Sequence, residues 1–481
     1  MKKRQWTGML AFLVFALSSA WAQSDSQPSS GTEQQPAAPP AAFGQEPAPP
    51  QVSPFPPLSG LDEASLEPNV AARSFLQPGF QVLEAADSNA VNGLNKGGTS
   101  FSSVTHLLGA VGLQRLWSRY QMSLDYVGGG VLYSLRDNAQ VHTLDLDSRI
   151  LWRTGVLQFR DGFSYLPEGS FGGAFGGAAG LGSGMGGVGN GLGEGTQGNR
   201  FNFFGAGVLG SLGTAPHYTN LSMVDMQQTL SPRAAFTLAG GYDLVHFLGD
   251  KSGIPLIDSR MVTAQAGYDY ALDRRNKLAV VYGYQHFLFP TIGGGTFDSH
   301  VVQFLYGHQI SGRMDLVLGG GPQLTSLNSS LRGSFLRISG SGRFSLRYRF
   351  PRTSVSLNYQ RYDSAASGFF AGAETDLAHV TLMRPLGRRW EISGHAGYAH
   401  VKRLQQVGNA GVNANSYQYG YTGLRLNRIL SRSLHGFVFY QYNDMIFDSS
   451  FCGTAGPCSR TSTRQIAGIG LTWHPHPFRL D

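Results

Sequence analysis

The 481-residue chain is poor in cysteine and in charge. It has only two cysteines, which excludes a framework of several disulfides. Charged residues make up 14% of the chain and the formal net charge is +7, too sparse for the electrostatic footprint of a nucleic-acid-binding protein. Beyond residue 22 no apolar run approaches the roughly 20 residues of a membrane-spanning helix, which excludes a helical membrane protein.

The first 22 residues have the pattern of a secretory signal peptide. Basic residues at positions 2–4 precede an apolar run over 9–16, and an A-x-A cleavage site ends at Ala22. A membrane anchor is the alternative, but the apolar run is shorter than a span requires. We therefore expect export, and removal of the three basic residues lowers the formal charge from +7 to +4.

The two cysteines, Cys452 and Cys458, lie in the segment FCGTAGPCS. In an exported chain this short, Gly- and Pro-containing spacing favours a disulfide that closes a small loop. A metal site is the alternative, but two thiolates without a neighbouring histidine are a poor ligand set. We expect no metal and no cofactor.

Residues 23–78 are rich in Pro, Ala, Gln and Ser. They offer too little apolar surface to offset the entropy lost on ordering, so we expect a disordered periplasmic arm. A spacer is its simplest role, and docking on a periplasmic partner is the alternative.

A different pattern fills residues 79–481, and the segment RISGSGRFSLRYRF illustrates it. Its odd positions carry Arg337, Arg343, Arg347 and Arg349 among serines, whereas its even positions carry mainly Ile, Phe, Leu and Tyr. Because strand side chains alternate between faces, this strand has a cationic face and an apolar face. The same alternation of apolar with small or polar residues recurs at 236–248, 262–272 and 353–360.

This alternation favours a membrane barrel over a soluble fold. A soluble sandwich packs bulky aliphatic residues inside, whereas a transmembrane barrel turns aliphatic and aromatic residues toward lipid and keeps its interior polar. Lipid leaves no backbone group unsatisfied, so the sheet must close. We therefore predict an all-β, antiparallel, up-and-down transmembrane barrel. A soluble sandwich or propeller is the alternative.

Eight short, arginine-containing turns separate pairs of apolar-alternating runs and set the strand count. Sixteen strands flank these turns, and one further strand at each end, 79–88 and 464–473, gives 18 with both termini periplasmic. Sixteen strands is the alternative. The turns lie in 116–122, 151–157, 230–235, 272–278, 310–316, 349–355, 385–392 and 430–436.

Two short motifs resemble known outer-membrane proteins. Gly468, Leu471 and Trp473 follow a Gly-x-x-apolar-x-aromatic order that is similar to the closing-strand signal of Gram-negative outer-membrane β-barrels, although the chain continues beyond it. This resemblance implies recognition by the barrel-assembly machinery through the C-terminal strand. It also implies an outer-membrane location, in contact with lipid and lipopolysaccharide.

The second motif opens the long connection over residues 167–218. Pro167, Glu168, Phe171, Gly172 and Gly173 resemble the start of the constriction loop of general porins, which folds into the pore. An inserted Gly-Ser and a glycine expansion depart from that pattern. A loop that stays external is the alternative.

The alternation along each strand also assigns charged residues to the barrel interior. The four arginines should face the water on the twelfth strand, opposite an acidic wall formed by Asp125, Asp145, Asp147, Asp243 and Asp269. Charges that line a pore filter ions and polar solutes, so we predict a porin-like passive channel for small polar or anionic solutes. If the arginines instead pair with local acids or lipopolysaccharide, they conduct nothing.

Two other functions stay open. The chain could be a structural or adhesive surface protein with a plugged lumen, or a conduit that exports a polymer. Assembly as a homo-oligomer is also left open. We do not expect an enzyme, because no nucleophile, histidine and orienting group stand at catalytic spacing.

Overall fold

The computed structural model describes residues 57–60, 74–88, 101–135, 137–167, 216–248, 256–290, 295–329, 333–365, 368–405, 413–452 and 459–480. All of them belong to one compact unit, residues 51–481. Within these ranges no helix is both long enough and apolar enough to cross a membrane.

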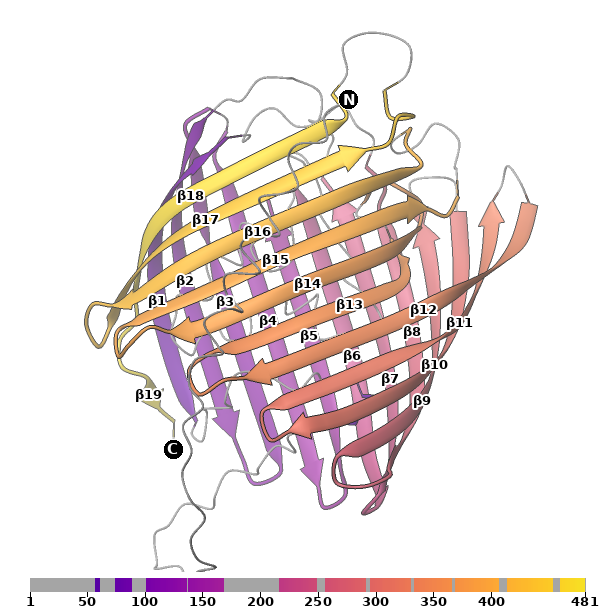
Figure 1. Cartoon of the computed structure of the whole chain (residues 1–481). Helices are drawn as coiled ribbons and strands as arrows, with labels where there is room; N and C mark the ends of the chain where they lie inside the picture. Colours follow the sequence, from indigo (N-terminus) through magenta and orange to yellow (C-terminus); the bar gives the residue numbers. More distant parts are fainter. Residues whose placement is uncertain are drawn as a thin grey trace, which may run out of the picture. The chain divides into compact units, whose positions relative to one another are not determined.

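The described chain forms one closed antiparallel sheet, in which strands that follow each other in sequence also pair in space, except for a short last strand that pairs with the first (Figure 1). The predicted 18-strand barrel is confirmed, and a two-residue strand, β19, is added after the last barrel strand. The strands are β1 (Phe75–Asp87), β2 (Ser102–Leu116), β3 (Tyr120–Tyr133), β4 (Ala139–Trp152), β5 (Gly155–Leu166), β6 (His217–Ser231), β7 (Ala234–Phe247), β8 (Ser259–Ala271), β9 (Asn276–Phe289), β10 (Gly295–Ser311), β11 (Met314–Ser329), β12 (Gly333–Arg349), β13 (Ser354–Ser364), β14 (Ala373–Pro385), β15 (Trp390–Arg403), β16 (Ser416–Ile429), β17 (Leu434–Phe447), β18 (Thr461–Trp473) and β19 (Phe478–Arg479).

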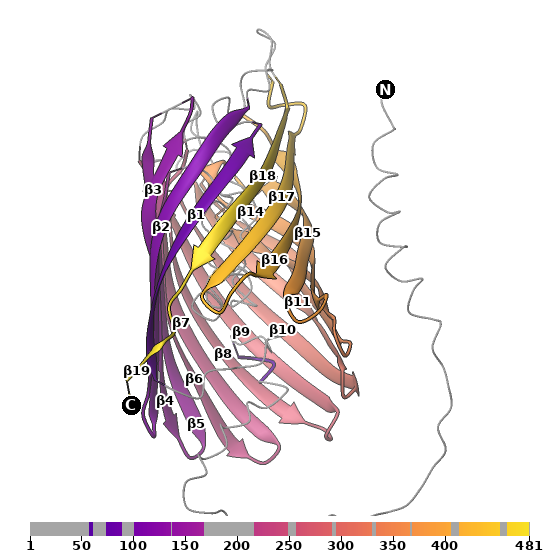
Figure 2. The same ribbon diagram turned by 90° about the vertical axis from the view of Figure 1, so that its left-hand side faces the viewer.

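The barrel closes where β1 pairs with β18, from Phe80 opposite Trp473 to Asp87 opposite Ile466 (Figure 2). All eight predicted arginine-containing turns join consecutive strands, and all lie at one end of the barrel, which we call the short-turn end. The other connections lie at the opposite end, the long-loop end. Sixteen strands, the alternative count, is therefore wrong.

The structure corrects the predicted boundary of the barrel at its start. β1 begins at Phe75, four residues before the expected Gly79, because its first residues pair with β2 on one side and with β19 on the other. Pro78, which has no backbone N–H to donate, lies in the short gap between the β19 and β18 pairings. Two parts of the region predicted to be disordered are thus ordered: 57–60 and 75–78.

The two faces of the barrel wall differ as the alternation predicts. On β12 the even residue Ile338 is 72% exposed on the outside, whereas the odd residues Ser345 and Arg347 are buried on the inside. The outer face of the barrel carries most of the exposed large apolar side chains, among them Phe304, Leu318, Leu424 and Ile469. An outward apolar band of this kind suits the hydrocarbon interior of a bilayer.

β12 and β13 separate toward the long-loop end (Figure 1). β12 pairs with β11 along its length, but it pairs with β13 only from Gly342 to Arg349. Beyond Arg361, β13 pairs with β14 alone among the described strands. We call this divergence the fork.

Candidate functional site: the barrel lumen

The five acidic residues predicted to line the lumen all lie on the inward face, on the strands predicted for them. Asp125 on β3 is paired in register with Asp145 on β4, which places two carboxylates side by side. Asp147 accepts hydrogen bonds from Gln158 at 2.6 Å and from Arg149 at 3.1 Å. Asp269 is 5% exposed on β8, where Lys277 of β9 is one of its charged neighbours.

The predicted arginine ladder lies on β12, but it is not a row of free cations. Arg337 forms an ion pair with Glu374 at 2.6 Å, and Arg347 forms one with Asp315 at 3.1 Å. Arg343 and Arg349 also have interaction partners. Arg337 and Arg347 are thus paired with nearby acidic residues, which was the alternative to unpaired arginines in the lumen.

Three further charged sites on the inward face were missed from the sequence. Arg464 on β18 donates from Nε to both carboxylate oxygens of Asp87 on β1 at 3.0 Å, and both residues are buried. Arg160 lies 3.2 Å from Asp225 in a second buried pair, and the buried Arg425 places its guanidinium carbon 3.8 Å from the centre of the Phe437 ring. The partners in the two ion pairs are distant in sequence, and only the strand register brings them together.

The inward face also carries more apolar side chains than the alternation predicted. A cluster of Leu83, Val104, Leu108, Val127 and Val131, with others, lies on the inner wall formed by β1 to β4. Further buried clusters include many aromatic residues. The expectation of a uniformly small and polar interior is wrong, because these side chains pack against one another and against chain segments inside the barrel.

The first such segment is the N-terminal turn, Pro57–Gly60, which lies inside the short-turn end near β8 (Figure 2, short indigo segment). The turn is closed by a hydrogen bond from the Gly60 amide to the Pro57 carbonyl at 3.1 Å. The amide of Leu58 donates to Asp269 Oδ1 at 2.6 Å, and the amide and hydroxyl of Ser59 also donate to that carboxylate.

Other lumen residues complete the contact with the N-terminal turn. The Ser59 carbonyl accepts hydrogen bonds from Gln265 Nε2 at 2.5 Å and from Thr237 Oγ1 at 3.1 Å. The Leu58 side chain, 7% exposed, packs in a cluster on the inner wall. The cluster comprises Met223, Ala279, Val281, Val301, Leu305 and Val317.

The second segment inside the lumen is Gly368–Gly372, which we call the tip segment because it joins β13 to β14. The Gly368 carbonyl accepts from the Ile257 amide just before β8, and the Gly372 carbonyl accepts from the Leu404 amide just after β15. Phe369 packs on Phe447 of β17 with ring centres 5.6 Å apart. β8 and β17 lie nine strands apart in a ring of 18, so the tip segment crosses the lumen at the long-loop end.

Two glycines allow this inward path. Gly368 and Gly372 have φ values of +82° and +89°, in the left-handed region that other residues rarely adopt. Between them Phe369 and Phe370 are 0% and 1% exposed. The string GFFAG was a usable signal in the sequence, because a Phe pair between two glycines is unusual for an external loop.

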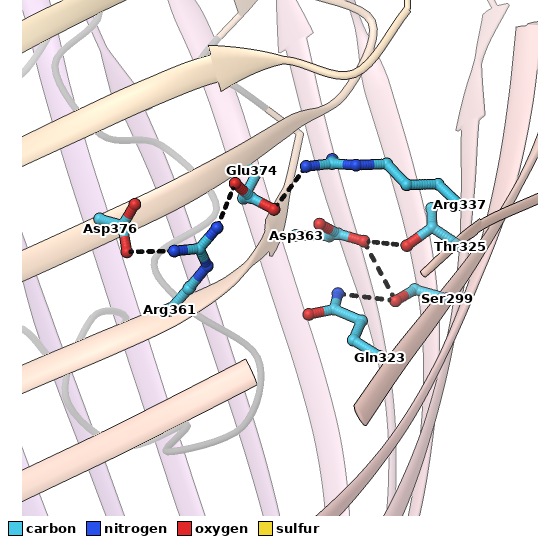
Figure 3. A network of polar contacts seen from close by, with 8 residues as sticks. All are labelled: Ser299, Gln323, Thr325, Arg337, Arg361, Asp363, Glu374 and Asp376. Atoms are coloured by element: carbon cyan, nitrogen blue, oxygen red, sulfur yellow. Dashed lines mark hydrogen bonds and ion pairs between the residues drawn. The ribbon is translucent and has the colours of Figure 1, made fainter. Parts of the chain in front are cut away.

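A polar network fixes the base of the tip segment at the fork (Figure 3). Glu374 accepts from Arg337 of β12 and from Arg361 of β13, both at 2.6 Å. Asp363, 1% exposed, accepts from Thr325 of β11 at 2.6 Å and from Ser299 of β10 at 3.2 Å. The end of β13 therefore reaches across the inner face of its neighbours instead of continuing beside β12.

Several predicted features fall on residues outside the described ranges. The long connection does follow the fifth strand and is the third at the long-loop end, but only Pro167 of the porin-like motif is described; Glu168, Phe171, Gly172 and Gly173 are not. Cys452 is described and Cys458 is not, so their disulfide stays a prediction. The signal peptide also lies outside the described part of the chain.

Comparisons with known proteins give only a distant likeness. No family model and no curated protein matches the chain. Among solved structures, OccK2 (OpdF) of Pseudomonas aeruginosa is 11% identical over 84% of this chain and 99% of its own, with a TM-score of 0.41. The FrpB iron transporter of Neisseria meningitidis is 7% identical over 83% of this chain and 82% of its own, with the same TM-score.

Proposed function

We propose that the chain is an outer-membrane transport barrel of a Gram-negative bacterium, with both termini in the periplasm. Small polar or anionic solutes pass through it by passive diffusion. The observation that carries this proposal is the closed barrel with an apolar outer face and inward rows of charged and amide side chains. A closed wall with a hydrophilic interior is the architecture that holds water across a bilayer.

The charges on β12 provide the selectivity in this proposal. Arg343 and Arg347 lie on the same inward face as Gln323 and Gln303, and the amides line a recess together with Ser341 and Gln360. Amide groups both donate and accept hydrogen bonds, so they can replace the water around a polar solute. The arginines lie beside that path, where Arg347 also pairs with Asp315, so reversing their charge changes the potential along it.

A plugged structural or adhesive barrel is the second candidate. It is favoured by the two segments inside the lumen, the N-terminal turn and the tip segment. The two candidates differ in one measurable property. A channel conducts ions in a planar bilayer, and a permanently plugged barrel does not.

The test of the diffusion proposal is ion selectivity in planar bilayers. Arg343→Glu combined with Arg347→Glu reverses two lumen charges, so we expect the zero-current potential in a salt gradient to shift toward cation preference. Arg352→Glu is the matched control, because Arg352 is exposed in the short turn after β12. Absence of conductance in the wild-type protein, or equal selectivity in all three proteins, would refute the proposal.

A further inference from the structure

The inner wall around Asp269 is shaped for a peptide. Its carboxylate accepts from two consecutive backbone amides, those of Leu58 and Ser59. Thr237 and Gln265 bind the Ser59 carbonyl from the neighbouring wall positions. Passage of small solutes does not require an acceptor for N–H groups beside donors for a carbonyl. A peptide turn offers both partners, because it presents consecutive backbone amides and a backbone carbonyl.

A glycine in the wall makes room for the turn. Gly267 lies on β8, and a Cβ added to it would collide with the Cβ of Ser59 and come within 2.8 Å of the Ser59 hydroxyl oxygen. Glycine weakens a strand, and in a strand interior it often marks the close approach of another backbone or a ligand. The wall thus has a polar pocket at Asp269, an apolar pocket for Leu58, and a gap between them at Gly267.

The contact is also suited to release. Asp269 lies two residues before the end of β8 at the short-turn end, so water can replace the turn at the carboxylate. Residues 61–73 connect the turn to β1, and thirteen residues can extend to about 45 Å. The turn can therefore leave the lumen without loss of any pairing in β1.

We propose that this pocket is a reversible peptide-binding site that narrows the short-turn mouth of the barrel, with the chain's own Pro57–Gly60 as its ligand. The site recognises a turn in which an apolar residue precedes serine. Its effect on permeation rests on the proposed channel function. Peptide binding itself does not.

The first experiment measures binding of the N-terminal turn to its pocket by cross-linking, so its outcome does not depend on whether the barrel conducts. Ser59→Cys with Thr237→Cys places two thiols where the hydroxyl oxygens are 2.8 Å apart. We expect oxidation to form the 59–237 disulfide, detected by mass spectrometry. Adding Asp269→Ala or Gly267→Ala should lower its initial rate about ten-fold or more, because charge-assisted hydrogen bonds or the space for Ser59 are lost. Gly130→Ala is the control, since its Cβ would meet nothing within 4 Å.

The second experiment supplies the ligand separately. A variant that lacks residues 24–60 is mixed with a fluorescent synthetic peptide, PFPPLSGLDE, which is residues 54–63. We expect saturable binding that is lost with Asp269→Ala and with a peptide carrying Asp at the Leu58 position. Equal binding of both peptides, or a cross-linking rate insensitive to Asp269→Ala and Gly267→Ala, would overturn the site.

Conductance then tests the narrowing of the mouth. We expect Gly267→Ala and the deletion variant to conduct more than the wild type, and the peptide to lower the conductance of the deletion variant. If the wild type conducts and eviction of the turn changes nothing, the narrowing is disproved while the channel stands. If no variant conducts, the channel fails together with the narrowing, and peptide binding still decides the site.

Discussion

Replacement of Phe369 and Phe370 by alanine is expected to raise the single-channel conductance about two-fold or more, because the two rings occupy part of the cross-section through which ions must pass. The two rings lie in the tip segment, which crosses the lumen from β8 to β17. Alanine removes both rings from that cross-section but leaves the two hydrogen bonds of the tip segment intact. Planar-bilayer recordings of the double variant and the wild type measure the effect.

The matched control for this prediction is Phe304→Ala. Phe304 is a phenylalanine on the outer face of β10 that is 61% exposed and lies outside the tip segment, so we expect unchanged conductance. Gly368→Ala gives a second, independent perturbation, because a Cβ there would lie 2.7 Å from the Phe247 ring and the backbone has a positive φ. Equal conductance in the wild type and the Phe369/Phe370 double variant would show that the tip segment does not limit permeation.

Strand number and facing could be predicted from the sequence because they depend on local patterns. The arginine-containing turns are read directly, and the period-two alternation assigns each residue to a face without knowledge of its neighbours. Asp243 and Asp269, for example, were placed on the correct strand and the correct face. The error at β1 is confined to residues 75–78, which were assigned to the arm by composition, whereas Phe75 and Leu76 pair with β2 and β19.

The contents of the lumen could not be predicted in the same way. Contact between Ser59 and Asp269 joins residues 210 positions apart, and no periodicity relates them. The porin-like motif at 167–173 directed attention to the third long connection, but the described segment that enters the lumen at the long-loop end is the one between β13 and β14. Its inward path depends on two left-handed glycines and on the divergence of β13 from β12, and alternation does not encode either.

The buried ion pairs illustrate the same limit. The alternation along β12 placed Arg337 and Arg347 on the inner face, but it cannot show whether an acidic residue lies beside them. Register supplies that information, since Arg347 is directly opposite Asp315 on β11. A row of arginines in a barrel strand is therefore a reliable sign of facing and a poor sign of free charge.

A large loss of stability is expected when the buried ion pair is removed from the seam, the pairing of β1 with β18 that closes the barrel. Asp87 of β1 and Arg464 of β18 are 1% and 6% exposed, and they join the first and the last long strands of the ring. Asp87→Asn removes the charge that faces Arg464, and loss of one partner of a buried pair costs about 3–5 kcal/mol. We expect a lower free energy of unfolding in detergent with urea, and a lower temperature at which the folded band disappears on SDS gels.

Asp147→Asn is the matched control for the seam. It removes a lumen carboxylate whose arginine partner, Arg149, has a side chain that is 35% exposed, so the expected loss is only about 0–1 kcal/mol. Asp87→Asn combined with Arg464→Gln should recover part of the stability lost in the single variant, because no buried cation then faces a neutral partner. If Asp87→Asn destabilises no more than Asp147→Asn, pairing of the backbones of β1 and β18 alone holds the ring closed. The ion pair then follows from closure and does not cause it.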